Sequence, residues 1–297
     1  MALKQALEDY GKLKRKKNKD WNFYEHLLPK IIDCCLRFEW KELPLMRQGK
    51  SQCVKLSAGQ VLHILANEFF LNTVSLTERL RREEQRDFGE ISFLGLYIGQ
   101  VDHSVASNRI LCQLSYLDQV DLESVKAREV SYERLRLEKP IEWSKCAIKV
   151  DVNKVNVHTK SMEESPAKAF VDFANRHIHI HQLIASCTQE EVLFSVAPEC
   201  FPIMLLAEEI GDSEAFVLRG LKRFSEYTGY LSSFKFKGPL LPNRDLDVIV
   251  IDASIGDASN APHEILRDLN KAFLAFSQFS GQSISTGHWG GGIFRNV

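Results

Sequence analysis

The chain has 297 residues, of which 44% are hydrophobic and 26% are charged, and its formal net charge is −1. This composition predicts an ordinary globular protein with a substantial core, and the balanced charge excludes a chain-wide basic field for nucleic acid. The seven cysteines form no C-x-x-C pair, the first residues contain no apolar signal segment, and no apolar run reaches the length of a membrane span. We therefore expect reduced thiols and a nuclear and/or cytoplasmic protein.

The segment Lys12 to Lys19, "KLKRKKNK", is the one dense basic cluster of the sequence. Such a cluster is typical of a nuclear import signal or of a contact with a polyanion. A solvated, lysine-rich helix end explains it equally well, so both interpretations stay open.

The N-terminal part of the sequence predicts mostly helix. Apolar residues recur near the 3.6-residue helical period in residues 21–38 and 57–72, and Ser57 is suited to cap the second of these helices. Residues 75–88 are strongly charged and predict an exposed helix or a linker, and residues 106–120 predict a further helix.

From about residue 127 the pattern changes to alternation, which is typical of strands. Residues 129–137 and 147–159 alternate, whereas residues 167–175 are apolar on both parities, as in a strand buried on both faces. Residues 214–224 and 245–254 also predict strands, the second with continuous apolar character.

Helices are predicted between these strands. Residues 190–210 predict a helix interrupted near Pro198 and Pro202, and residues 262–276 predict an amphipathic helix. Its shared apolar face comprises Ile265, Leu266, Leu269, Ala272, Phe273 and Phe276. Residues 282–294 predict a strand that runs into a glycine loop. This alternation indicates a parallel or mixed α/β sheet, with ligands at the carboxyl ends of strands, near "FAN", "SEYTGY" and "TGHWGGG".

Three alternating histidines, His177, His179 and His181, have two interpretations. On a strand they would share one face, where two imidazoles and the nearby Cys187 could bind zinc. No H-x-x-x-H or C-x-x-C spacing supplies further ligands, which favours a polar strand or loop edge without metal.

The triplet Gln189-Glu190-Glu191 follows a loop and begins a predicted helix. A carboxylate at this position is favoured by the helix dipole, so capping explains one glutamate. Neighbouring helical side chains diverge by about 100°, so only one glutamate could readily point into a cleft as an acid/base group.

Two further motifs each have a structural and a functional interpretation. Tyr227 and Tyr230 in "SEYTGY" could stack on a base or simply pack at a strand end. The glycines of "GHWGGG" could bring backbone N–H groups close to phosphate oxygens or form a tight turn.

The order of these motifs is more specific than any one of them. "VDFANR" stands twelve residues before "QEE", and "FSEYTGY", "VIVIDAS", "LRDLNKAF" and "STGHWGGGIF" follow. From about residue 40 to 297 the sequence resembles the poly(ADP-ribose) glycohydrolase family. The resemblance implies an α/β fold, a macrodomain-like three-layer α/β/α sandwich preceded by a helical accessory domain. We expect the helical domain, with its basic N-terminal segment, over 1–125 and the catalytic domain over 126–297.

The resemblance implies hydrolysis of the ribose–ribose O-glycosidic bonds of poly(ADP-ribose) by carboxylate acid/base catalysis, without cofactor or metal. Glu191 matches the catalytic acid/base, which would protonate the departing ribose 2′-oxygen and then activate water. Glu190 and Gln189 would position the distal ribose. Asp172 and Asn175 would support the site and hold ribose hydroxyls.

Other matches concern the nucleotide side of the substrate. Tyr230 matches the aromatic residue beside the adenine, and Glu163 matches the adenine-side glutamate with a one-residue gap. The second diphosphate loop matches His288, Trp289, Gly290, Gly291, Gly292, Ile293 and Phe294. The implied partners are poly(ADP-ribose) or ADP-ribose, and poly(ADP-ribosyl)ated proteins, with no membrane contact and no direct DNA readout.

The sequence also departs from the family pattern. The triple glycine of the first diphosphate loop falls on His179, Ile180 and His181, and β-branched Ile180 resists the φ values that glycine permits. His288 replaces an asparagine. The sequence stops before the last helix and strand of the family, which implies an incomplete product or a partner on that face. Two hypotheses therefore stay open: an active glycohydrolase, and a catalytically impaired paralogue that binds ADP-ribose or acts as an interaction module.

Overall fold

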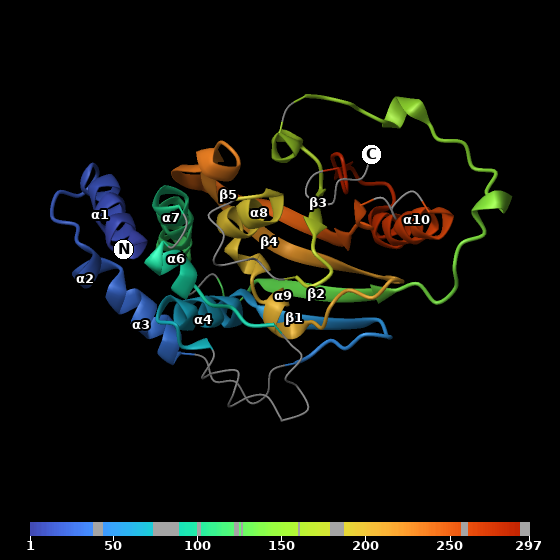
Figure 1. The fold of residues 1–297 in the computed structure, drawn as a ribbon. Coiled ribbons are helices and arrows are strands. Elements are labelled where there is room, and N and C mark those ends of the chain that lie inside the picture. The colour runs from blue at the N-terminus through green and yellow to red at the C-terminus, as the bar shows by residue number, and fades with distance from the viewer. Residues whose placement is uncertain are drawn as a thin grey trace.

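The molecule has a central sheet with helices on both faces, and the N-terminal helices lie together at one end of the molecule (Figure 1). The computed structural model describes residues 1–37, 44–73, 89–99, 102–121, 125, 127–159, 161–178, 187–256 and 261–291. The charged segment predicted at 75–88 lies outside these residues. Within the described ranges, no helix is long and apolar enough to cross a membrane.

The N-terminal part is mainly helical, as predicted. Its helices are α1 (Ala2–Arg15), α2 (Phe23–His26), α3 (Leu28–Leu36), α4 (Ala58–Phe69), α6 (Leu94–Ile98) and α7 (His103–Gln119). Ser57 caps α4: its Oγ accepts the Gln60 N–H at 3.1 Å, while Gln60 Oε1 accepts the Ser57 N–H at 2.9 Å. The predicted cap is therefore confirmed, and it satisfies two polar groups that a helix start would otherwise leave unpaired.

The sheet is mixed, as the alternation of strands and helices predicts. Its strands are β1 (Gln52–Ser57), β2 (Glu129–Arg136), β3 (Ala169–Ala174), β4 (Glu214–Thr228), β5 (Lys235–Asp252) and β6 (Ile284–Ser285). They lie in the order β1-β2-β4-β5-β3-β6. β3 runs parallel to both of its neighbours, whereas the other pairs are antiparallel.

Alternate residues of the strands pack on opposite sides of the sheet. Phe216 and Leu218 join the large core that includes the N-terminal helices, whereas Ala215 and Val217 pack against α10 (Pro262–Phe276). The remaining elements are α8 (Gln189–Val196), α9 (Ile203–Leu206), η3 (Trp143–Lys145), η4 (Val152–Lys154), η5 (Met162–Glu164), η6 (Pro198–Cys200), η7 (Leu231–Ser233) and η9 (Ser277–Phe279). The three-layer α/β/α arrangement with a preceding helical domain is thus confirmed (Figure 1).

The strand β1 is a correction to the mostly helical prediction for the N-terminal part. Val54 and Leu56 alternate with exposed residues and are buried, and Val54 lies opposite Tyr132 of β2. The strand forms because β2 offers it a free edge and its inward side chains reach the core. β1 and β2 therefore pair although the predicted boundary at 125/126 falls between them in the sequence.

The prediction of a strand at residues 147–159 is wrong. This stretch contains only the 3₁₀ turn η4, and no described strand pairs with it. Its alternating apolar side chains are exposed: Ile148, Val150, Val152, Val155 and Val157. Alternation marks residues suited to a strand, but a strand forms only where a neighbouring edge accepts its backbone hydrogen bonds.

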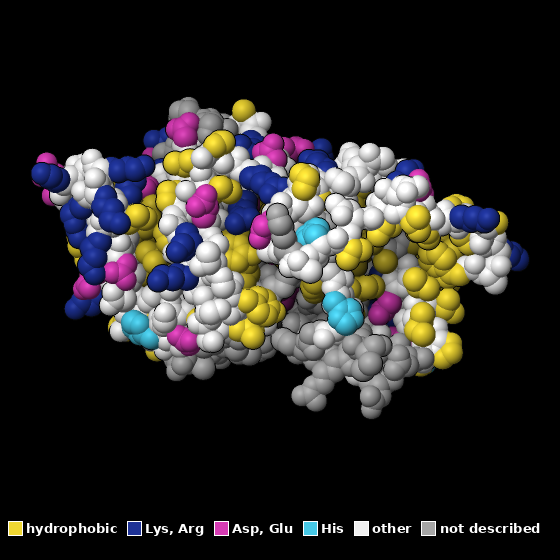
Figure 2. Space-filling model, turned by 90° about the horizontal axis from the view of Figure 1, so that it is seen from above, with side chains coloured by type: hydrophobic (Ala, Val, Ile, Leu, Met, Phe, Trp, Pro, Cys, Tyr) yellow, Lys and Arg dark blue, Asp and Glu magenta, His cyan; other side chains and the backbone are white. Residues whose placement is uncertain are grey.

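The helix predicted at 262–276 is confirmed as α10, but its predicted apolar face is not the buried one. Four of the predicted residues are 43–47% exposed: Ile265, Leu266, Leu269 and Phe273. Leu274 and Ala275 face the sheet instead, together with Lys271, whose Nζ bonds to Asp252 Oδ1 at 2.5 Å. Hydrophobic side chains accordingly gather at the right-hand end of the molecule in Figure 2, over α10 and the segment 143–157.

The basic cluster lies at the end of α1. Lys14 forms an ion pair with Asp118 of α7 at 2.5 Å, and Lys12 forms one with Asp9 at 2.8 Å. The lysines beyond the helix are exposed. These contacts fit a solvated helix end, and the import signal stays a prediction.

Candidate active site

The predicted acidic residues meet where β3 ends and α8 begins. β3 is buried on both faces between β5 and β6, and Asp172 near its carboxyl end is 0% exposed. Asn175 follows the strand directly and is exposed at the rim. α8 begins with the triplet, so Glu190 and Glu191 lie in its first turn, where both are buried. The position agrees with the expectation that ligands bind at the carboxyl ends of parallel strands.

Gln189 attaches α8 to the edge of β3. Its Oε1 accepts the Phe173 N–H at 2.9 Å, and its Nε2 donates to the Val171 carbonyl at 3.1 Å. β6 pairs only with residues 169 and 170, so the glutamine amide continues the backbone pairing of β3 beyond the end of β6. Gln189 therefore fixes the distance between the strand and the two glutamates that follow it.

Asp172 and Glu190 are buried carboxyls with incomplete hydrogen bonding. Among the described residues, neither oxygen of Asp172 has a partner, nor has Oε1 of Glu190. Burial, and next the charge of Glu191, raises the pKa of Asp172 to about 8. Burial, and next the charges of Asp172 and Glu191, raises the pKa of Glu190 well above its usual value, although hydrogen bonds to Asn175 oppose the rise. Both carboxyls can therefore hold a proton near neutral pH.

Glu191 has a different environment because it caps its own helix. Its Oε2 accepts the Thr188 N–H at 2.7 Å and also the Thr188 hydroxyl, while the Thr188 hydroxyl accepts the N–H of Glu191. This is a capping box, the structural role that the sequence suggested for one glutamate. Both described hydrogen bonds end on Oε2, so the cap does not require Oε1.

A cleft of about 520 Å³ lies beside the triplet. Its lining consists of Ser161, Met162, Glu163, Glu164, Phe173, Gln189, Val192, Arg223, Tyr227, Thr228, Gly229, Tyr230 and Gly287. The volume lies within the range that small-molecule sites usually have. Of the predicted site residues, Glu163, Gln189 and Tyr230 line it directly.

The two tyrosines of "SEYTGY" lie at different places in this cleft. Tyr230 is 51% exposed, and its phenol contacts the backbone of Gln189, so it lies beside the triplet. Tyr227 is half-buried, and its phenol lies beside Ser161 and Glu163. Burial, and next the negative charge of Glu163, raises the pKa of Tyr227 to about 12, so it stays a neutral hydrogen-bond donor.

The glycine loop near the end of the sequence approaches the cleft through Gly287. A Cβ built on this glycine would lie 3.3 Å from the Phe173 ring. His288 is exposed, and Trp289 packs against the core with its Nε1 donating to the Ile251 carbonyl at 3.3 Å. Gly290 has a φ of +80°, which favours glycine there. Gly291 follows with its N–H bonded to the His288 carbonyl, whereas the predicted site residues Gly292, Ile293 and Phe294 lie outside the described residues.

The histidine stretch is described only in part. His177 is exposed, and its Nε2 lies 2.9 Å from Glu209 Oε2, whereas Cys187 is buried. His179, Ile180 and His181 lie outside the described residues. In the part of the chain that the structure describes, no group of three His, Cys, Asp or Glu residues could hold a metal ion.

Sequence reasoning missed three contributors to the site. Phe173 follows Asp172 and presents its ring to the cleft, a position that strand alternation could have indicated. Thr188 could have been found as the first residue of a T-x-x-E capping box. Arg223 gave no sequence signal, because its place in the cleft depends on the tertiary arrangement that brings β4 beside Glu163 and Gln189.

The sequence matches known proteins over both parts of the chain. Two family models match, poly (ADP-ribose) glycohydrolase helical domain over residues 15–134 and poly (ADP-ribose) glycohydrolase macro domain fold over residues 141–297. Poly(ADP-ribose) glycohydrolase 1 of Arabidopsis thaliana is 32% identical over 198 residues, which cover 62% of the chain and 35% of the relative. Probable poly(ADP-ribose) glycohydrolase 2 of the same plant is 28% identical over 83% of the chain and 50% of the relative.

A further relative comes from an animal. Poly(ADP-ribose) glycohydrolase 1 of Caenorhabditis elegans is 28% identical over 65% of the chain and 28% of the relative. The chain thus spans half or less of the length of these relatives. Because the macro-domain model alone matches more than half of the residues, the chain belongs to the poly(ADP-ribose) glycohydrolase family.

Proposed function

We propose that the chain binds an ADP-ribose unit of poly(ADP-ribose) in the cleft and hydrolyses the ribose–ribose O-glycosidic bond next to it. The observation that carries the proposal is the grouping of Asp172, Glu190 and Glu191 at one rim of the sheet. Three carboxyls in a buried position cost folding free energy, and two of them leave oxygens without partners that ribose hydroxyls could satisfy.

In this reaction Glu191 is the acid/base residue. As acid it gives a proton to the departing ribose 2′-oxygen while the bond from that oxygen to the anomeric carbon breaks. As base it takes a proton from the water that forms the new bond to the same carbon, which restores the starting state. Asp172 and Glu190, which hold protons near neutral pH, would donate to and accept from hydroxyls of the bound ribose.

The test measures release of ADP-ribose from poly(ADP-ribose) by the purified chain. We expect release by the unaltered chain, loss of release in Glu191→Gln, and unchanged release in Glu226→Gln. Glu226 is an exposed glutamate of β4 outside the cleft lining, so it controls for the loss of one carboxylate. Release that persists in Glu191→Gln would contradict the assignment of Glu191.

A second candidate function is binding of ADP-ribose without turnover. It is favoured by the capping box, because Thr188 holds Oε2 of Glu191 with two hydrogen bonds that a reacting carboxylate would have to share. In that case calorimetry would detect ADP-ribose binding, while no ADP-ribose would be released from the polymer. As a binder, the chain would recognise poly(ADP-ribosyl)ated proteins through the modification rather than through the protein surface.

A further inference from the structure

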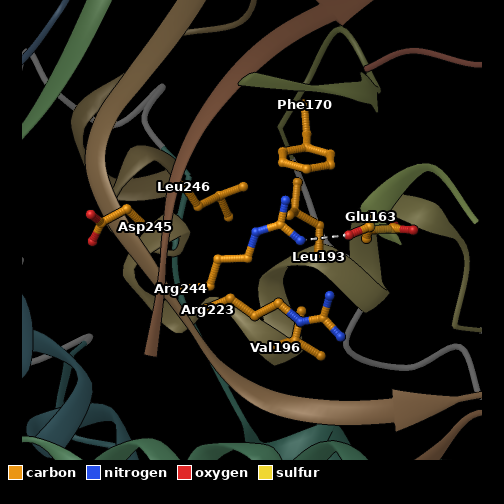
Figure 3. Close-up of a pocket in the computed structure, with 8 residues that line it drawn as sticks. All are labelled: Glu163, Phe170, Leu193, Val196, Arg223, Arg244, Asp245 and Leu246. Carbon is orange, nitrogen blue, oxygen red and sulfur yellow. Dashed lines mark hydrogen bonds between the residues drawn. The ribbon is translucent and has the colours of Figure 1, made fainter. Parts of the chain in front are cut away.

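A small cavity adjoins the cleft on its Glu163 side (Figure 3). Its volume of about 20 Å³ is enough for a water molecule but far too small for a nucleotide. The cavity shares Glu163 and Arg223 with the cleft. Arg244 and Phe170 also line the cavity. The side chains around this cavity therefore hold the cleft in shape rather than receive a ligand of their own.

Arg244 holds the segment that carries Glu163. Its Nη1 donates to the Glu163 carbonyl at 3.0 Å (Figure 3). Its Nη2 donates to the Ser165 carbonyl. The guanidinium also lies over the Phe170 ring of β3, 5.5 Å from the ring centre. A planar guanidinium can bond two carbonyls at once, a geometry that the single ammonium of lysine does not reproduce.

The Glu163 segment has few other attachments. It consists of the single 3₁₀ turn η5, and it follows the long stretch 147–159 that contains no strand. Besides Arg244, three contacts attach the turn: Ser285 Oγ donates to the Met162 carbonyl at 2.9 Å, the Tyr227 phenol lies beside Ser161 and Glu163, and Met162 packs against the core. A turn without sheet pairing keeps its place only through such contacts, so Arg244 is a main determinant of where Glu163 lies.

Arg244 is also linked to Tyr227, through Arg223 of the neighbouring strand. Arg244 lies directly across from Arg223 in the β4–β5 pairing, and the Arg223 guanidinium lies 5.2 Å from the centre of the Tyr227 ring. Like charges that face each other across strands repel. Here the aromatic faces of Phe170 and Tyr227 and the backbone carbonyls offset this cost. The two arginines thereby hold Glu163 and Tyr227 next to each other in the lining of the cleft.

We propose that Arg244 is a positioning residue that fixes the Glu163 wall of the cleft and so determines the affinity for the ADP-ribose unit. This role rests on the proposed function, because it assumes that the cleft receives that unit. Arg244 touches neither the triplet nor Asp172 in the described contacts, and it therefore acts on binding and not on the bond-breaking step.

The test compares Arg244→Gln and Arg244→Lys with the unaltered chain. We expect the Kd for ADP-ribose and the KM for poly(ADP-ribose) to rise roughly tenfold in Arg244→Gln, with kcat changed less than about twofold, because two charge-assisted hydrogen bonds are lost. Arg244→Lys should show an intermediate rise, since one ammonium replaces part of the contact. Lys222→Gln removes the neighbouring positive charge, which pairs with Asp245 outside the cleft lining, and should change neither constant.

Hydrogen exchange of the amides in residues 161–165 tests the positioning role without relying on activity. These amides should exchange faster in Arg244→Gln than in the unaltered chain, at an unchanged melting temperature. Unchanged exchange, or a fall in kcat at constant KM, would overturn the positioning role while leaving the proposed function intact. Absence of ADP-ribose binding by the unaltered chain would instead overturn the proposed function together with this inference.

Discussion

Asp172→Asn should make the protein more stable at alkaline pH than the unaltered chain. The Asp172 carboxyl is fully buried and without a hydrogen-bond partner among the described residues, and burial raises its pKa to about 8. A carboxyl whose pKa is higher in the folded than in the unfolded state contributes most stability below its unfolded value of 3.8. That contribution is lost as the pH rises toward 8, because folding then requires a proton that the solvent supplies less readily.

The magnitude follows from the two pKa values. Between about pH 5 and pH 8 the unfolded aspartate is mostly ionised and the folded one is mostly protonated, so each pH unit removes about 1.4 kcal/mol from the free energy of unfolding. Three units therefore remove about 4 kcal/mol. Asparagine stays neutral at every pH, so the substituted protein escapes this loss. At roughly 2 °C of melting temperature per kcal/mol, the difference amounts to about 8 °C in a protein of this size.

The assay is a thermal melt of both proteins at several pH values from about 5 to 8. The melting temperature of Asp172→Asn minus that of the unaltered chain should increase steadily with pH. Asp20→Asn, a change at an exposed aspartate, provides the control and should give a small difference that is constant with pH. A difference for Asp172→Asn that is equally flat would refute the idea that Asp172 is protonated in the folded protein.

Three further substitutions test the fold and the cleft. Glu199→Gln should lower the free energy of unfolding by about 2–3 kcal/mol in urea denaturation, because the fully buried carboxylate that pairs with the partly buried Arg128 guanidinium and accepts the Lys222 N–H loses its charge. Ser57→Ala should cost about 1 kcal/mol in the same assay, since α4 loses its capping box. Gly229→Ala should weaken ADP-ribose binding severalfold in calorimetry, because the glycine has a φ of +80° and an added Cβ would lie 2.0 Å from the Ser233 carbonyl oxygen. Unchanged affinity would show that the turn before Tyr230 adapts.

The strands and helices that could be predicted are those that have a regular pattern of apolar residues and a neighbouring element for their buried side chains to contact. β3 was predicted because it is apolar on both faces, and it is buried on both. β1 was missed because its six residues stand directly before a helix and show only two buried apolar side chains, Val54 and Leu56. The stretch 147–159 shows the opposite failure, since its alternation is clear but no described strand edge receives it.

The orientation of α10 shows what periodicity cannot decide. The helical period correctly groups Ile265, Leu269 and Phe273 on one face, yet these side chains are over two-fifths exposed. The sheet instead receives the neighbouring face, where Lys271 is fully buried and bonds to Asp252 and to the Gly211 carbonyl. A buried lysine is tolerated only with such partners, and Asp252 stands at the end of β5, 19 positions before Lys271 in the sequence.

The acidic residues of the site could be identified from the sequence, but the contacts that hold them in place could not. The motifs place Asp172, Glu190 and Glu191 together because a strand end and a helix start meet at the same rim. The contacts that fix these groups involve other elements. Gln189 reaches back to the backbone of β3, and Arg244 reaches from β5 to the Glu163 segment. Such contacts depend on the tertiary arrangement and leave no local pattern to read.

The capping and catalytic interpretations of the glutamate pair are compatible in the folded protein. The cap uses Oε2 of Glu191 and fixes the carboxyl in one orientation through the backbone and hydroxyl of Thr188. A reacting group that is already oriented loses less conformational entropy when substrate binds, and Oε1 is not needed for the cap. Asp172 and Glu190 lack such donors on their unpartnered oxygens and are driven toward the neutral form by burial. Three buried carboxyls at one rim thus differ in their hydrogen bonds: Glu191 is held by the cap, whereas Asp172 and Glu190 keep oxygens without a partner among the described residues.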